Sequence, residues 1–288
     1  MIKFDGKNHD LGGGMFVTRI LPNFQKRTVG PFVFLDHMGP IVEHPNQNTD
    51  VRAHPHIGLS TLTYLFEGRI VHRDSTGAMA SIEPGEVNWM TAGKGISHSE
   101  RTHPDDKNKS RSLHGLQFWI ALPRDQEECE PSFIHYEKNH IPLFQNDQYS
   151  LKLIAGEAFG LRSPVKVSSS LIFAEIKAQN DSIIDLSELN FEVAIYVISG
   201  LVKIDVECIN ERQVIIIDND HLSEIRFYKN AHFVIIGGKP LDEPRHLFWN
   251  FVSSSKERIE RAKTEWRERT FPMVPGESEF IPLPESKS

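Results

Sequence analysis

The chain has 288 residues, of which 39% are hydrophobic and 25% are charged, and its formal net charge is −7. The length favours two domains of ordinary size, and no apolar run approaches the ~18 residues of a membrane span, so we expect no membrane insertion. The negative charge is unlike the basic surface of nucleic-acid-binding proteins, so we expect no direct nucleic-acid contact. The start of the chain lacks the features of a secretory signal, which predicts a cytoplasmic protein.

Short β-prone runs separated by Gly and Pro fill the first half of the chain. Residues 58–71 are apolar at both odd and even positions, which is typical of a strand covered on both faces, and the pair Glu67–Gly68 marks a turn. The other runs are residues 15–21, 29–38, 80–82, 87–91 and 116–122. Many short strands with this punctuation predict an all-β barrel or sandwich rather than alternating strands and helices.

The second half repeats this pattern after a polar connector at residues 123–147. Its β-prone runs are residues 151–155, 165–175, 193–206, 214–217 and 232–238. The run Ala194–Val202 holds the place that Thr61–Ile70 has in the first half, which indicates a degenerate internal repeat that has lost the histidines. We therefore predict a metal-binding domain at residues 1–122 and a domain without metal ligands at residues 148–288, which includes a C-terminal helix and tail.

The helix is indicated by a change of period near the end of the chain. Ile259, Ala262 and Trp266 lie three or four residues apart, as on one face of a helix, and Ser254 with Glu257 fits a capping box. The proline-containing tail that follows Phe271 is expected to be extended and to wrap around the body of the protein.

A metal site is predicted from two pairs of polar residues with the same spacing. His54 and His56 flank Pro55, and His98 and Glu100 flank Ser99, so each pair leaves the same face of a strand. An isolated His-x-His pair is weak evidence, but the joint pattern offers three nitrogens and one carboxylate oxygen to one ion. Because these donors include no thiolate, one divalent ion of iron, manganese, nickel, copper or zinc would suit them equally.

These motifs resemble the pirin family of bicupins. The matching strings are His54-Pro-His-Ile-Gly, Tyr64-Leu-Phe-Glu-Gly, Pro84-Gly-Glu-Val-Asn-Trp-Met-Thr-Ala-Gly-Lys-Gly-Ile-Ser-His-Ser-Glu, Gly115-Leu-Gln-Phe-Trp, Gly237-Gly-Lys-Pro-Leu-Asp-Glu-Pro and Trp249-Asn-Phe-Val. The resemblance covers almost the entire chain and implies an all-β bicupin, with two tandem cupin-type β-barrels and a short C-terminal helix. It also implies an Fe(II) ion held by His54, His56, His98 and Glu100. Many cupins and pirins have a glutamate four residues after the second histidine, where this chain has Ser60, so the surroundings of the site are expected to differ there.

The resemblance also implies a function. Some bacterial pirins cleave the flavonol quercetin with dioxygen, so the leading expectation is a quercetin 2,3-dioxygenase-like oxidoreductase that takes a flavonol-like substrate and O2. Glu100 then serves as the catalytic base for the flavonol 3-hydroxyl. The alternative is an iron-dependent regulatory protein that acts through a protein partner without turnover, as eukaryotic pirins do. A third is a metal protein acting on an unknown metabolite or partner enzyme.

Further residues are expected to surround the metal. Four apolar side chains are candidates for the substrate pocket, with ordinary core packing as the competing interpretation: Phe32, Phe34, Met90 and Phe118. Four polar residues are candidates for orienting the ligand imidazoles: Asp36, His37, His114 and Gln117. The other histidines are interpreted as surface or hydrogen-bonded core residues, because no spacing pairs them with a second ligand: His72, His103, His135, His140, His221, His232 and His246.

Overall fold

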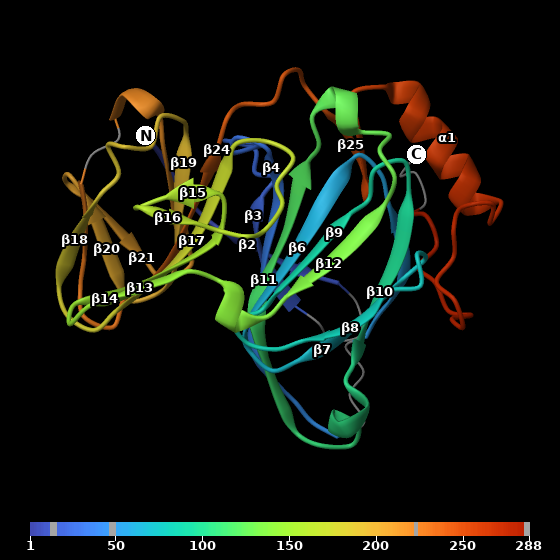
Figure 1. Ribbon diagram of the computed structural model, residues 1–288, viewed down its shortest axis with the longest axis horizontal. Coiled ribbons are helices and arrows are strands. Elements are labelled where there is room, and N and C mark those ends of the chain that lie inside the picture. Colours follow the sequence, from blue (N-terminus) through green and yellow to red (C-terminus); the bar gives the residue numbers. More distant parts are fainter. Residues whose placement is uncertain (12–15, 46–49, 222–223, 285–288) are drawn as a thin grey trace. The chain divides into compact units, whose positions relative to one another are not determined.

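The computed structural model describes residues 1–11, 16–45, 50–221 and 224–284, and the chain forms two compact units. Unit 1 comprises residues 1–9, 18–36 and 137–240, and unit 2 comprises residues 10–17, 37–136 and 241–288. Each unit consists mainly of antiparallel strands (Figure 1). The all-β class predicted from the sequence is therefore confirmed.

The described residues of unit 1 form two main sheets, which share one apolar core, and a third sheet of two strands. The larger sheet has the strand order β1 (Ile2–Asp5), β22 (Gln213–Ile217), β19 (Val193–Ser199), β24 (His232–Gly238), β17 (Leu171–Ala178), β14 (Tyr149–Ala155) and β13 (Leu143–Gln145). The smaller has the order β18 (Ser182–Asp185), β23 (Glu224–Phe227), β20 (Leu201–Ile204) and β21 (Glu207–Asn210), and β15 (Glu157–Ala158) pairs with β16 (Leu161–Arg162). Ile195 of the larger sheet and Phe227 of the smaller sheet belong to the same buried cluster, so alternate side chains from both sheets fill the interior.

Unit 2, where it is described, also has two main sheets, in addition to a two-stranded sheet near the C-terminal helix. One includes, in order, β12 (Ser132–Tyr136), β9 (Val87–Thr91), β6 (Leu59–Glu67), β11 (Arg111–Ala121) and β4 (Phe32–Glu43). The other, which we call the ligand sheet, has the order β5 (Val51–His56), β10 (Ile96–Thr102), β7 (Ile70–Asp74) and β8 (Met79–Ile82). The strands β2 (Lys7–Asp10), β3 (Phe16–Leu21) and β4 each have residues in both units. Within the described part of the chain, four short 3-10 helices occupy loops: η1 (Pro104–Asp106), η2 (Arg124–Gln126), η3 (Lys138–His140) and η4 (Asn219–His221).

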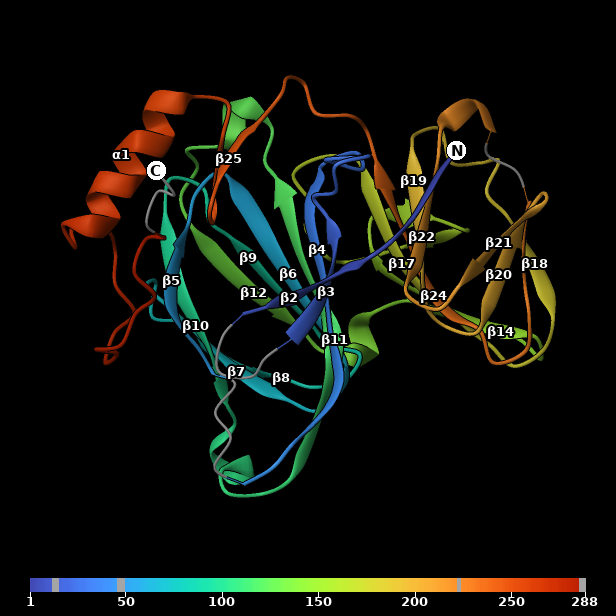
Figure 2. The same ribbon diagram turned by 180° about the vertical axis from the view of Figure 1, so that it is seen from behind.

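The C-terminal helix α1 (Lys256–Arg267) belongs to unit 2, where it lies beside the hairpin of β25 (His246–Phe248) and β26 (Phe251–Ser253), as Figures 1 and 2 show. The sequence boundaries had instead placed this helix in the second domain. The physical reason for its position is its apolar stripe, because the buried Ile259, Ala262 and Trp266 form a cluster with Ile57 and Phe251. None of the helices in the described residues is long and apolar enough to cross a membrane.

The helix begins one residue later than the sequence predicted. Ser255 rather than Ser254 is the N-cap, and its hydroxyl oxygen accepts a hydrogen bond of 3.1 Å from the backbone N–H of Arg258. Ser254 instead binds Glu127, through both its backbone N–H and its hydroxyl. The predicted capping box is therefore displaced, because three consecutive serines compete for the cap and tertiary contacts engage the other two.

Replacing Ser255 with alanine is expected to lower the free energy of unfolding by about 1 kcal/mol, because the N–H of Arg258 loses its partner. Urea denaturation measures the change. Lys256→Ala is the matched control, because this exposed side chain at the first helical position should leave stability within about 0.5 kcal/mol. An equal loss in both variants would contradict the assignment of the cap.

The tail after the helix covers the outer side of the ligand sheet. Phe280 forms a parallel bridge with Ala53, and the backbone N–H of Ile281 donates to the carbonyl of Ala53 at 2.8 Å. Ser97 donates from its hydroxyl to the carbonyl of Pro272 at 2.6 Å. Because β5 is the last strand of its sheet, the tail supplies partners to an edge that would otherwise be unpaired.

Candidate metal centre

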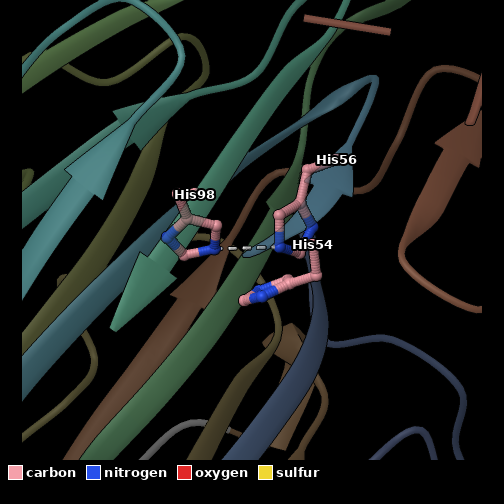
Figure 3. A group of neighbouring side chains, drawn as sticks. All are labelled: His54, His56 and His98. Atoms are coloured by element: carbon pink, nitrogen blue, oxygen red, sulfur yellow. Dashed lines mark hydrogen bonds between the residues drawn. The ribbon is translucent and has the colours of Figure 1, made fainter. Parts of the chain in front are cut away.

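The strand register brings the three predicted histidine ligands together. In the antiparallel pair of β5 and β10, His98 lies opposite His54 and Ile96 lies opposite His56. Alternation along the two strands then turns all three imidazoles to one face, as the sequence predicted. Figure 3 shows the three rings converging from these strands. Pro55 between the two histidines has no N–H to donate, and its place on an edge strand leaves no ladder hydrogen bond missing.

The ring nitrogens are close enough to share one ion. One ligand atom from each histidine lies within 4.8 Å of the others, and the Nε2 atoms of His56 and His98 are 3.1 Å apart (Figure 3). Nδ1 of His54 lies 2.8 Å from the carbonyl oxygen of Arg52. A carbonyl only accepts hydrogen bonds, so Nδ1 of His54 carries the proton and Nε2 retains the lone pair that a metal requires.

Burial keeps these imidazoles in the neutral form that binds metals. The exposed fractions of His54, His56 and His98 are 7%, 1% and 2%. Burial lowers the pKa of His54 to about 4, while the neighbouring Arg52 carbonyl partly opposes the shift. Burial and the adjacent imidazoles also hold the pKa values of His56 and His98 well below 6.5. Three buried neutral nitrogens that face one point fit a divalent transition-metal ion, because isolated polar atoms are otherwise costly to bury.

Glu100 lies two residues beyond His98 but is not part of the close three-histidine group. The pairing of β10 with β5 shifts between His98 and Glu100, and the partner of Glu100 on β7 is His72. Its Oε1 lies 3.3 Å from the hydroxyl of Thr63, whose oxygen is also 2.9 Å from Oε1 of Gln117. Burial raises the pKa of Glu100, and the contacts with His72 and Thr63 partly oppose this shift.

The sheet that faces the histidines presents both polar and apolar side chains to them. Thr63 pairs with Gln117 across β6 and β11, so both side chains point to the same face of the sheet. Trp119, two residues after Gln117, points to this face too, and its ring lies 5.2 Å from the ring of His56. Met90 pairs with Thr61 and therefore shares this face. Phe118, expected in the pocket, points to the opposite face of β11, because the alternation that turns Gln117 and Trp119 toward the site turns Phe118 away.

Three other predicted residues belong to unit 1. The carboxylate of Asp36 accepts two hydrogen bonds of 2.8 Å from Arg19, and the same guanidinium stacks 4.5 Å above the ring of Phe34. Burial raises the pKa of Asp36, against the opposing effect of Arg19. Phe32 is fully buried, and its backbone pairs with Val29. These contacts give Phe32, Phe34 and Asp36 structural roles of their own.

His37 and His114 form a second histidine pair in unit 2. Their Nε2 atoms lie 2.7 Å apart, and the rings stack with a centroid distance of 4.9 Å. Since a hydrogen bond between two imidazoles needs one donor and one acceptor, the two rings must adopt complementary tautomers. His114 also contacts the ring of Phe66, edge to face.

His72 lies close to a predicted ligand although the sequence paired it with none, and Ser60 lies on the face of β6 opposite to Thr63. His72 is buried and hydrogen-bonded, as one of the two interpretations proposed, but its Nδ1 lies 3.4 Å from Nδ1 of His98. Ser60, at the position where many relatives of the motif carry glutamate, is fully buried, and its hydroxyl lies 3.1 Å from that of Thr91. This hydroxyl pair satisfies Ser60 without a metal contact.

Comparison with known proteins covers both halves of the chain. Residues 14–120 match the family model described as Pirin, and residues 173–272 match that described as Pirin C-terminal cupin domain. A pirin-like protein of Caulobacter vibrioides is 44% identical over 98% of both chains. A protein of Pseudomonas aeruginosa named putative quercetin 2,3-dioxygenase is 36% identical over 90% of this chain and 81% of its own. The crystal structure of quercetin 2,3-dioxygenase from Acinetobacter baumannii superposes with a TM-score of 0.91 at 31% identity, over 99% of this chain and 95% of its own.

Proposed function

Because this chain belongs to the pirin family and has its bicupin fold, we propose that it is a mononuclear metal enzyme that cleaves quercetin-type flavonols with dioxygen. The observation that carries the proposal is the convergence of three buried, neutral imidazoles on one point. The names of two similar proteins support the substrate class.

We assign His54, His56 and His98 as the metal ligands and Glu100 as a fourth ligand that can dissociate from the ion. Iron(II) is the ion that the family resemblance implies, although imidazole and carboxylate donors also suit manganese, nickel, copper and zinc. When bound, the ion supplies Lewis acidity, which makes the flavonol 3-hydroxyl easier to deprotonate. Three protein nitrogens leave positions for further ligands, as a catalytic site requires.

The residues of the chain then bind the flavonol and move its proton. Glu100 accepts the proton of the 3-hydroxyl, and Thr63, which contacts both Glu100 and Gln117, holds the carboxylate in place. Met90 and Trp119 supply apolar surface on the same face of their sheet, which suits a flat aromatic ligand. In the balanced reaction, both atoms of dioxygen enter the ring-opened ester and one carbon leaves as carbon monoxide.

Purified protein tests the proposal directly. Its metal is identified by elemental analysis, and the protein is then mixed with quercetin under air while flavonol absorbance and carbon monoxide are followed. We expect one carbon monoxide released for each quercetin consumed. Glu100→Ala should abolish this turnover, and Glu137→Ala, which replaces an exposed glutamate of unit 1, should leave it unchanged. An iron-loaded protein that turns over no flavonol would contradict the enzyme and favour a metal-dependent binding protein.

A further inference from the structure

We propose that His72 and Asp74 are positioning residues that orient the ligand His98 through a directed hydrogen-bond relay. The inference rests on metal binding by the three histidines but not on flavonol turnover. Both residues lie on β7, the neighbour of β10 in the ligand sheet, and both are buried, with exposed fractions of 3% and 1%. Neither offers a direct ligand to the three-histidine group.

Two short distances connect three side chains in series. Nδ1 of His98 lies 3.4 Å from Nδ1 of His72, and Nε2 of His72 lies 2.9 Å from Oδ2 of Asp74. The ring of His72 stacks on Phe133, with centroids 4.2 Å apart and planes inclined by 11°. The stacked ring cannot rotate freely, so its two nitrogens stay aimed at His98 and Asp74.

The hydrogen-bonding capacity of each group sets the direction of the relay. The carboxylate of Asp74 accepts, so Nε2 of His72 must carry a proton. In the neutral form of His72 the lone pair then lies on Nδ1, where it accepts from His98, so the proton of His98 lies on Nδ1. This leaves Nε2 of His98 free to bind a metal, and Nε2 is the atom that faces Nε2 of His56 at 3.1 Å. The relay thus selects the tautomer that metal binding requires.

The turn after β7 fixes the orientation of Asp74. Oδ1 of Asp74 accepts from the backbone N–H of Thr76 at 2.8 Å, from the hydroxyl of Thr76 at 2.6 Å and from the backbone N–H of Ala78 at 3.3 Å. Only Oδ2 is left to face His72. The two oxygens therefore have separate tasks, one holding the turn and the other holding the imidazole.

Asp74→Asn replaces the hydrogen-bond acceptor that faces His72 with a donor, while the shape of the side chain hardly changes. The three donors around Oδ1 require an oxygen there, so the new amide nitrogen must face Nε2 of His72. His72 then presents its lone pair at Nε2 and a proton at Nδ1, which opposes the proton on Nδ1 of His98. We expect the relay to break and His98 to lose its bias toward the protonated Nδ1 form.

Two measurements without flavonol test the relay. Nitrogen NMR of the histidine-labelled, metal-free protein reports each tautomer, and titration with nickel(II) reports affinity. In the unaltered chain we expect a proton on Nδ1 of His98 and on Nε2 of His72. In Asp74→Asn we expect His98 to shift toward the other tautomer and nickel affinity to fall about 10- to 100-fold. Asp106→Asn, which changes a carboxylate paired with Arg69 in the same unit, is the matched control and should change neither.

Replacements of His72 separate positioning from packing. His72→Gln can accept from His98 through its amide oxygen and donate to Asp74 through its amide nitrogen, so it should retain more nickel affinity than His72→Leu. Equal affinity of the two variants, or an unchanged His98 tautomer and affinity in Asp74→Asn, would overturn the relay. If these effects are seen but quercetin is not turned over, only the proposed dioxygenase activity is overturned. If the unaltered chain binds no nickel, both the relay and the metal site on which it rests are overturned.

Discussion

Replacing His98 with alanine is expected to remove the metal from the protein and to abolish flavonol turnover. His98 is one of three mutually close rings, because its centroid is 4.3 Å from that of His54 and 5.0 Å from that of His56. Zinc sites in small peptides bind with about 10–16 kcal/mol, so each of four ligands contributes about 2.5–4 kcal/mol, or roughly 10²- to 10³-fold in affinity. Titration of the metal-free variant with iron(II) or nickel(II) measures this loss.

His135→Ala is the matched control for this experiment. His135 lies in the same unit and is also hydrogen-bonded, with its Nδ1 2.8 Å from Oδ1 of Asn88, but it is outside the three-histidine group. We expect it to retain metal and turnover. If His98→Ala bound metal as tightly as the control does, the histidines would be a packed core cluster, and the proposed activity would lose its basis.

Ending the chain at Thr270 is expected to weaken metal binding although the removed segment contains no histidine. The deletion removes the buried side chains of Phe271 and Val274, and burial of each contributes about 1.5–3 kcal/mol. It also removes the bridge to Ala53 and the 2.6 Å ion pair between Arg101 and Glu277. The stability of unit 2 should therefore fall by roughly 3–6 kcal/mol, and β5, which carries two ligands, should lose its edge partner.

Thermal unfolding and nickel titration measure the two effects of the deletion. Phe233→Ala is the control for general destabilisation, because it creates a cavity in the core of unit 1 at a cost of about 3–5 kcal/mol. It should lower stability without lowering nickel affinity in the folded protein. Equal nickel affinity in the deleted and full chains would show that the tail has no part in holding the ligand strands.

The pairing of the histidine ligands and the buried face of the helix were predictable, because both depend on side-chain spacings of two to four residues. A period of two turns His54 and His56 to one face, and a period of three to four aligns Ile259, Ala262 and Trp266 on the helix. Both patterns are visible in a few consecutive residues. The structure places each set as the sequence predicted, with the histidines in one group and the helix residues buried.

Features that depend on strand neighbours were not predictable in this way. His72 contacts His98 because β7 pairs with β10, and nothing local to either strand specifies that partner. For β11, alternation shows that Trp119 and Phe118 point to opposite faces, but both are buried, so hydrophobicity does not reveal which one faces the histidines. Trp119 was missed for this reason.

The contact between Phe280 and Ala53 has a consequence for how the protein is made. A ribosome synthesises the edge strand β5 well before Phe280, so this edge of unit 2 has no tail partner while the intervening chain is made. Until Phe280 is made, the strand that carries His54 and His56 has an edge whose backbone groups can pair with other chains.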